Sequence, residues 1–193
     1  MTNTERAART RANLVLAAAR RFDRHGYDGT ALNHICAGAG VTLGALTFHF
    51  RSKAALASAV VDEGVRALQR IRTARPDTGR PLHDLTVLVL QVAGALQHDV
   101  LPRAATRLVE EGHVDSGWPG IWRAEVLRLL ERAFVTGDLA PDVRPAAAAH
   151  LVMHVVEGAA HEARRAEAGG VWVASDVAEV WHAALGGLAA HPR

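Results

Sequence analysis

The chain has 193 residues, one cysteine, 5% aromatic residues and a formal net charge of +2. It is long enough to bury a core without a metal or disulfides, and the single Cys36 excludes an internal disulfide framework and fits a reducing compartment. The N-terminal stretch is polar and basic, unlike a signal peptide, and the longest uncharged apolar run, residues 85–98, is too short to cross a bilayer. We therefore expect a cytoplasmic protein that does not enter a membrane.

The charge is spread unevenly along the chain. Residues 1–53 hold eight Lys and Arg against three Asp and Glu, whereas residues 54–193 hold fourteen against seventeen. A basic head on an acidic body indicates a polyanionic partner for the head alone. The alternative is a solvated, arginine-rich helix face.

Helical periodicity runs through nearly the whole chain, without a convincing alternating strand segment, and predicts an all-α fold. We expect a first helix over about 5–25, with Leu14, Ala18 and Phe22 on one stripe, ended by the two glycines of residues 25–29. A short second helix over about 30–38 is expected to be capped by Thr30. After a tight turn at Gly40, a third helix over about 42–49 would be capped by Thr42, and a fourth covers about 52–75.

Residues 75–81, Arg-Pro-Asp-Thr-Gly-Arg-Pro, predict a loop and the clearest break in the chain. Further helices are expected at about 82–98, 103–112, 118–136, 145–168 and 175–190, where Gly137-Asp138 and Gly169-Gly170 end helices and Pro145 suits a helix start. We assign residues 1–53 to an N-terminal domain and 54–193 to a C-terminal domain, joined by the helix over 52–75.

Residues 30–53, TALNHICAGAGVTLGALTFHFRSK, predict a helix-turn-helix whose second helix enters the major groove of DNA. Small residues at Gly44 and Ala45 would let the helix backbone approach DNA closely. Lys53 opens the next helix, where its charge is predicted to meet a phosphate. The residues expected to pack the two short helices together are Leu32, Ile35, Cys36, Val41, Leu46 and Phe50.

From about residue 11 to residue 60 the chain resembles the TetR family of bacterial repressors. The resemblance rests on Gly40-Val41-Thr42, Gly44-Ala45-Leu46 and Phe48-His49-Phe50 followed by Ser52-Lys53, which are most similar to the γ-butyrolactone receptor branch. It implies a three-helix DNA-binding domain followed by helices that bind a ligand and form a homodimer. The DNA-contacting residues expected from this resemblance are Thr30, Asn33, Thr42, Leu43, Gly44, Ala45, Thr47, Phe48, His49 and Lys53.

Two of these residues depart from the family pattern. Leu43 stands where the family usually has Lys or Arg, and Thr47 stands where it usually has Tyr. Loss of one cation removes about one phosphate contact and flattens the salt dependence by about 0.9 log unit per log unit of salt. Either the operator differs, or binding is weaker, or the DNA head has degenerated.

A tryptophan-containing segment carries the ligand prediction. Residues 117–122, Gly-Trp-Pro-Gly-Ile-Trp, are similar to the γ-butyrolactone receptor segment whose tryptophan meets the ligand, and Trp122 is the matching residue. An indole covers an apolar ligand broadly, and its N–H can donate one orienting hydrogen bond. The candidate ligand-binding residues are Trp122, Trp118, Val87, Leu88, Val92 and Val126, with ordinary core packing as the alternative.

The last two predicted helices carry broad faces of apolar and small residues. Paired from two protomers, such faces would form a four-helix interface, which matches the dimer that the resemblance implies. The candidate interface residues are Leu151, Val152, Val155, Ala159, Val177, Trp181 and Leu185. Packing within one chain is the alternative.

The histidine spacing offers a different possibility. His150, His154, Glu157 and His161 follow one another at spacings of four, three and four, which could present a metal site on one helix face. The order of these residues is not that of zinc hydrolases, and no nucleophile stands in a recognisable context, so we expect no metal, no cofactor and no catalysis.

The leading hypothesis is therefore a repressor that binds double-stranded operator DNA and is released by a small apolar, γ-butyrolactone-like effector. One rival is a ligand-binding protein with a degenerate DNA head, motivated by Leu43 and Thr47. The other is a helical metalloprotein or enzyme, which rests on the histidine spacing alone.

Overall fold

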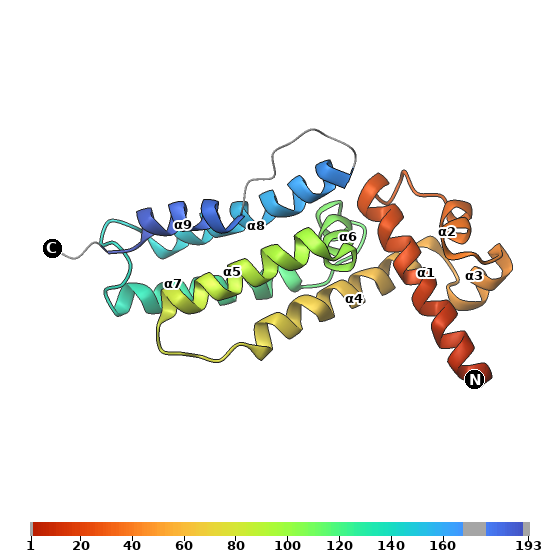
Figure 1. Cartoon of the computed structure of the whole chain (residues 1–193), viewed down its shortest axis with the longest axis horizontal. Coiled ribbons are helices and arrows are strands. Elements are labelled where there is room, and N and C mark those ends of the chain that lie inside the picture. Colours follow the sequence, from red (N-terminus) through yellow and green to blue (C-terminus); the bar gives the residue numbers. More distant parts are fainter. Residues whose placement is uncertain (1, 168–176, 191–193) are drawn as a thin grey trace. The chain divides into compact units, whose positions relative to one another are not determined.

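The computed structural model describes residues 2–167 and 177–190, and these ranges are helical with short connections (Figure 1). The helices are α1 (Asn3–His25), α2 (Leu32–Ala39), α3 (Leu43–His49), α4 (Lys53–Ala74), α5 (Pro81–His98), α6 (Val100–Glu110), α7 (Trp118–Val135), α8 (Pro145–Glu167) and α9 (Val177–Leu188). The all-α prediction is confirmed, and extended pairing in the described residues is limited to one isolated bridge between Leu139 and Ala189.

The described chain divides into two compact units. The first contains the residues up to Ala67 together with Asp99–Ser116, and the second contains Leu68–His98 together with the described residues from Gly117 onward. Helix α4 continues from one unit into the other, and α6 belongs with the helix-turn-helix. The predicted division between residues 53 and 54 therefore does not coincide with the division between these units.

In the first unit, α1 packs against α2 and α6. The predicted stripe of Leu14, Ala18 and Phe22 is fully buried. Helices α4 and α6 come close together at Gly64, where a Cβ would lie 2.5 Å from the Leu101 carbonyl oxygen and 2.5 Å from the Ala105 Cβ. A side chain at this position would force the two helices apart, so the contact depends on glycine.

A buried ion pair explains why α6 joins the first unit. Arg103 on α6 donates from Nε to an Asp23 carboxylate oxygen on α1 at 2.7 Å, and both side chains are almost completely buried. One turn later, Arg107 donates to the Asp23 carbonyl oxygen. Because charges this deep in a protein need partners, the pair ties α6 to α1 across about eighty residues of sequence.

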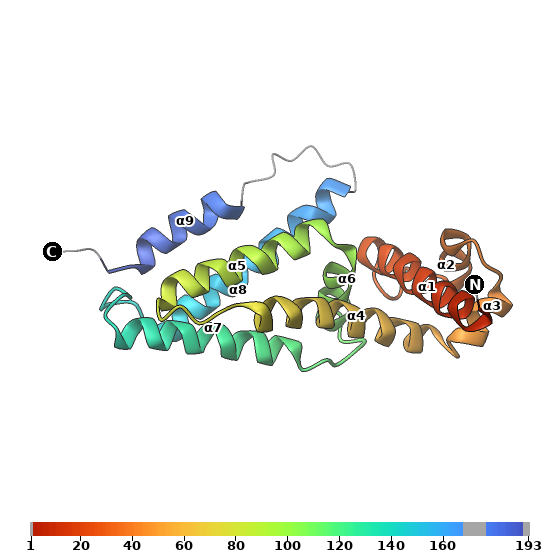
Figure 2. The same cartoon turned by 60° about the horizontal axis from the view of Figure 1, so that its bottom comes forward.

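In the second unit, α5 lies among α7, α8 and α9, and α8 also packs against α7 and α9 (Figure 2). The buried face of α5 includes Leu85, Leu88, Val92 and Leu96. Ala93 on α5, Ala159 on α8 and Val177 on α9 form a cluster where the three helices meet. Small residues at these contacts let the helix axes come close together.

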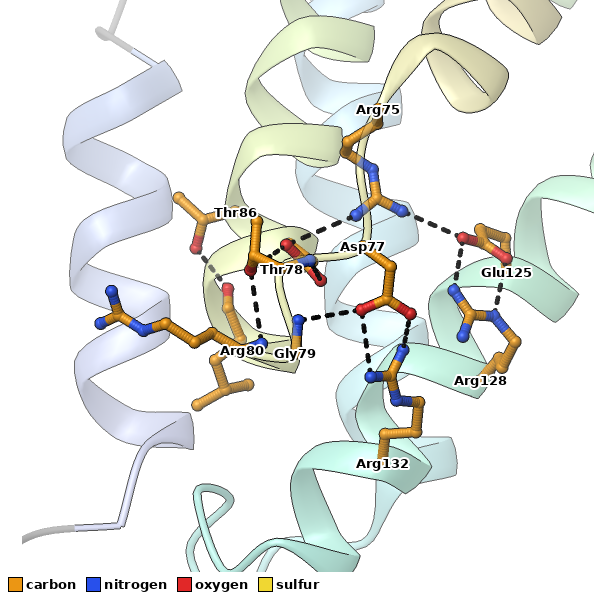
Figure 3. Close-up of polar contacts among 11 residues, drawn as sticks. Arg75, Asp77, Thr78, Gly79, Arg80, Thr86, Glu125, Arg128 and Arg132 are labelled. Carbon is orange, nitrogen blue, oxygen red and sulfur yellow. Dashed lines mark hydrogen bonds and ion pairs between the residues drawn. The ribbon is translucent and has the colours of Figure 1, made fainter.

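An ionic network joins the end of α4, the predicted loop and α7 (Figure 3). Arg75 donates to Glu125 on α7 at 3.0 Å, and Glu125 also accepts two hydrogen bonds from Arg128. Arg132 binds both carboxylate oxygens of Asp77, at 2.6 and 3.1 Å. The loop over residues 75–80 is therefore held against α7 by charged groups, although its composition predicted only a break.

The observed helix bounds follow the predicted ones to within two residues at most ends. The main difference is α6, which begins at Val100 instead of about 103, because the Asp99 carboxylate caps it by accepting from the Leu101 N–H at 2.9 Å. Helix α9 ends at Leu188 because Ala190 donates to the Asp138 carbonyl oxygen instead of continuing the helix. The predicted ends at 168 and 175, and the glycine pair at 169–170, lie outside the described residues.

No single helix among the described residues is long and apolar enough to cross a membrane. Helices α5 and α6, which follow one another in the sequence, reach the length and apolar content of a membrane span only as a bent pair.

Candidate functional site: a helix-turn-helix surface and a tryptophan-bearing helix

The turn between α2 and α3 is shaped by Gly40, which adopts φ +65° and ψ +34°. In this left-handed conformation its N–H reaches back to the end of α2, and the Val41 N–H donates to the Cys36 carbonyl oxygen. Thr42 then caps α3, because its hydroxyl oxygen accepts from the Ala45 N–H at 3.2 Å. The predicted turn and the predicted Thr42 cap are confirmed, and they orient α3 relative to α2.

Most of the residues predicted to contact DNA lie on the surface of this unit. The exposed ones are Asn33, Thr42, Leu43, Gly44, Thr47 and Phe48, and the half-exposed ones are Ala45, His49 and Lys53. Leu46 and Phe50 are buried, as expected for residues that hold α3 against the unit. One face of α3 is thus available to a partner, although its contacts with DNA stay a prediction.

Thr30 does not cap α2 as predicted. Its side chain is only 2% exposed, and its hydroxyl donates to the carbonyl oxygens of Gly26 and Arg21 at the end of α1. Helix α2 begins at Leu32 after Ala31, with no side-chain cap. The Thr30 side chain therefore ties the loop between α1 and α2 to the end of α1, and its contact with DNA stays a prediction.

Lys53 is also engaged inside the unit. Its Nζ donates to the carbonyl oxygens of Tyr27 at 2.9 Å and Thr30 at 3.1 Å, and it lies 4.2 Å from the centre of the Tyr27 ring. This ammonium group stabilises the loop before α2 through two charge-assisted hydrogen bonds and a cation–π contact. Its predicted phosphate contact would compete with these partners.

The same loop is held from the other side by α6 and the residues that follow it. The Tyr27 N–H donates to Glu111 at 2.9 Å, and the His113 ring stacks on the Tyr27 ring at 4.2 Å. Burial alone would raise the pKa of Glu111, but the hydrogen bonds from Tyr27 and Arg107 lower that pKa below its ordinary value. Glu111 is thus favoured as an acceptor in its ionised form.

Arg11 and Arg51 are exposed cations that the sequence reasoning did not single out. Arg51 follows α3 by two residues, and the Arg11 guanidinium lies 5.1 Å from the centre of the Phe50 ring. Arg11 could have been identified from the arginine-rich N-terminal helix, and Arg51 from the Arg-Ser-Lys sequence after Phe50. Both are suited to phosphate contact by charge and exposure.

In the second unit, Trp118 and Trp122 stack along α7 with their ring centres 6.3 Å apart. Trp122 is 3% exposed, and its Nε1–H makes no hydrogen bond to any described residue. Burial of an N–H without an acceptor costs free energy, so this group is available for an acceptor brought by a ligand.

The other candidate ligand-binding residues lie on α7 and on its neighbour α5. Val126, Leu88 and Val92 are buried, and Val87 is half-buried. The packing of α5 against α7 brings the two helices that carry all six candidates together. Their contact with a ligand stays a prediction.

Much of the predicted dimer face is part of the protomer itself. Val152, Ala159, Val177 and Trp181 are buried within the single chain, because α9 packs on α8 and α5. Val155 and Leu185 are half-buried, whereas Leu151 is 40% exposed and Val180 is 43% exposed. The four buried residues therefore pack within one chain, and contacts of the other candidates with a second copy stay a prediction.

Two histidines of α8 lie close to charged side chains. His150 Nε2 lies 2.8 Å from Arg123 Nη2, and His154 Nδ1 lies 3.4 Å from Glu157. Among the described residues, no group of three or more His, Cys, Asp or Glu side chains is arranged to hold a metal.

Comparison with known proteins agrees with this arrangement. The sequence model of the family described as "Bacterial regulatory proteins, tetR family" matches residues 14–60, which include α2, the turn and α3. The A-factor receptor protein of Streptomyces griseus is 35% identical over 195 residues, which cover 100% of this chain and 68% of that protein.

Solved structures resemble most of the chain. A crystal structure described as a γ-butyrolactone receptor (ArpA-like protein) has a TM-score of 0.81 and 31% identity, and covers 96% of this chain and 90% of its own. CprB of Streptomyces coelicolor, solved in complex with its biological operator sequence, has a TM-score of 0.75 and 32% identity. The match covers 95% of this chain and 90% of the CprB chain.

Proposed function

Because the chain belongs to the TetR family of bacterial regulatory proteins, we propose that it is a transcriptional repressor that binds operator DNA through α3. The observation that supports α3 as the reading helix is its exposed face, held outward by the Gly40 turn, the Thr42 cap and the buried Leu46. Arg11 and Arg51 would contact phosphates beside it. This regulator needs no catalysis, and its DNA partner would place it in the bacterial cytoplasm.

Gel-shift titration with the region upstream of the protein's own gene tests DNA binding. Ala45→Asp places a carboxylate on the half-exposed side of α3 and should abolish the shifted band at moderate salt. Ala124→Asp, on an exposed position of α7, is the matched control and should bind as the wild type does. Equal binding by both variants would remove α3 from the DNA interface and favour the rival with a degenerate head.

We further propose that the effector is a small apolar molecule with a hydrogen-bond acceptor, such as a γ-butyrolactone, bound against Trp122. Support comes from the buried, unpaired Nε1–H of Trp122 and from the likeness to the A-factor receptor and the ArpA-like receptor structure. A lactone carbonyl would accept from this N–H, and the apolar residues of α5 and α7 would cover an alkyl chain. A ligand preferred by one conformation shifts the population between DNA-binding and released forms.

The test is release of operator DNA by a synthetic alkyl-substituted γ-butyrolactone. Trp122→Ala should raise the concentration needed for release by at least about tenfold, since it loses both apolar contact and the N–H donor. Trp122→Phe keeps a ring without the N–H and should fall between Trp122→Ala and the wild type. If both variants bind DNA and release it as the wild type does, the ligand does not contact this residue.

We also propose a homodimer whose interface includes a stripe of exposed and half-buried residues on α8 and α9. Leu151 and Val155 on α8 lie at helical spacing with Gly158 and Glu162, and Val180 on α9 lines the same groove as Val155, Gly158 and Glu162. Val155, Gly158, Glu162 and Val180 line a groove of about 230 Å³ that a second copy would cover. Two such protomers would present two reading helices to a two-fold symmetric operator.

A further inference from the structure

The exposed face of α3 is apolar at both edges. Leu43 is 46% exposed and Phe48 is 82% exposed, with Gly44 and Thr47 exposed as well. A helix turns by about 100° per residue, so these four residues lie within an arc of about 140°, in the order Leu43, Thr47, Gly44, Phe48. Leu46 is buried on the opposite side of the helix.

The centre of this face is low. Apart from its chain neighbours and the backbone of α3 itself, a Cβ at Gly44 would have the Thr42 hydroxyl oxygen as its nearest atom, at 3.8 Å, so the space beside the backbone is open. The face therefore presents Leu43 and Phe48 at its edges, with the Thr47 side chain and the bare backbone of Gly44 between them. A partner surface could approach the backbone at Gly44 and contact Leu43 and Phe48 on either side.

The polar side chains of residues 42–49 are two threonines and a histidine, none of which pairs with two atoms of one base. The Thr42 hydroxyl oxygen accepts from Ala45, and the Thr47 hydroxyl donates to the Gly44 carbonyl oxygen at 3.0 Å. Residues 43–49 contain no Arg, Lys, Asn or Gln, the residue types that pair with two atoms of guanine or adenine. His49 is half-buried, with its ring edge against Phe48 at 5.2 Å between centres.

The feature of the major groove that an apolar side chain recognises is the C5-methyl group of thymine. We propose that Leu43 and Phe48 determine operator specificity by contacting thymine methyl groups, an inference that rests on α3 being the reading helix as proposed above. Leu43 then recognises a base, whereas the Lys or Arg usual at this position would contact a phosphate. The absence of a cation at position 43 therefore accompanies a change in the preferred operator sequence. Each half-site must carry thymine at the position that meets each side chain.

The test uses a duplex selected from a random-sequence library by the full-length wild-type chain. Each thymine of the selected consensus is replaced in turn by deoxyuridine, which pairs identically and lacks only the methyl group. Fluorescence anisotropy should show wild-type affinity falling by about fourfold at each sensitive position, the effect of one methyl-sized apolar contact.

Each side chain is assigned to a thymine by measuring the affinity of every protein variant for every deoxyuridine-substituted duplex. Leu43→Ala should lose the preference for thymine over deoxyuridine at one position and keep it at the other, and Phe48→Ala should do the reverse. Leu43→Met keeps an apolar side chain and should keep the preference. Because both residues are exposed, the melting temperatures of the variants should match that of the wild type, which separates loss of recognition from loss of folding.

Equal affinity of the wild type for the thymine and deoxyuridine duplexes at every position would overturn the inference and leave the repressor proposal standing. Retention of both preferences by Leu43→Ala and Phe48→Ala would overturn it equally. If the wild-type chain selected no duplex at all, the proposed DNA-binding role of α3 would fail, and the inference would fail with it.

Discussion

Lys53 and Arg51 are two cations beside α3 that have different surroundings. Lys53 donates to two backbone carbonyls and lies over the Tyr27 ring, whereas Arg51 is exposed. Lys53→Met should lower the free energy of unfolding by roughly 2 kcal/mol, the loss of two charged hydrogen bonds and a cation–π contact. Thermal or urea unfolding measures this change.

Arg51→Met removes the same charge from an exposed position and is the matched control. It should leave the unfolding free energy nearly unchanged and reduce the slope of log affinity against log salt by about 0.9. If Lys53→Met instead reduces the salt slope and leaves stability unchanged, Lys53 meets a phosphate after all.

At the scale of helices, the buried ion pair between Asp23 and Arg103 joins α1 to α6. Arg103→Met removes the guanidinium that pairs with a buried carboxylate, and should destabilise the first unit by about 3–5 kcal/mol. Asp23→Asn combined with Arg103→Met removes the charge as well, and should recover part of the loss. Equal unfolding free energies for the single and double variants would show that the pair is not what stabilises this contact.

Glu125 on α7 gives the second unit a pH dependence. Its pKa is lowered from the ordinary value of 4.5, mainly by the hydrogen bonds from Arg128 and further by the charge of Arg75, while burial acts in the opposite direction. A carboxyl whose pKa is lower in the folded state stabilises the fold above its unfolded pKa, and this stabilisation is lost as the pH falls through the folded pKa.

Glu125→Gln should therefore lower the melting temperature at pH 7 by a few degrees, corresponding to roughly 1 kcal/mol. The difference from the wild type should shrink as the pH is lowered from 5 to 3. Glu131→Gln, at an exposed position of the same helix, should show almost no difference at either pH. A deficit at Glu125→Gln that is the same at pH 7 and pH 3 would exclude the ionised pair as its cause.

At the scale of the whole molecule, dimerisation is tested by charging the stripe on α8 and α9. Leu151→Glu combined with Val180→Glu places two carboxylates on the proposed interface, and should give monomers in sedimentation with weakened operator binding. Phe134→Glu with Val135→Glu, exposed positions at the end of α7, is the control and should remain dimeric. Charge at Ala159 would not test the interface, because Ala159 is buried in the protomer against Ala93 and Val177. A dimer that survives Leu151→Glu with Val180→Glu would place the interface elsewhere.

Local interactions are what the sequence by itself determined. The helix periodicity, the Gly40 turn and the Thr42 cap depend on residues only a few positions apart, so their spacing predicts them directly. The exposed position of Leu43 and the buried one of Leu46 follow from the same spacing once α3 is placed after the turn.

Only the tertiary structure decided which partners polar and apolar side chains find far away in sequence. From the sequence, Thr30 and Lys53 are expected on the surface. In the structure they donate hydrogen bonds to carbonyl oxygens of the loop between α1 and α2. The small-residue face of α8 suits a partner helix from either the same chain or another, and the packing of α9 inside the protomer assigns Ala159 to the core. An apolar pattern in the sequence predicts that a helix face will be buried, whereas the tertiary fold determines which element covers that face.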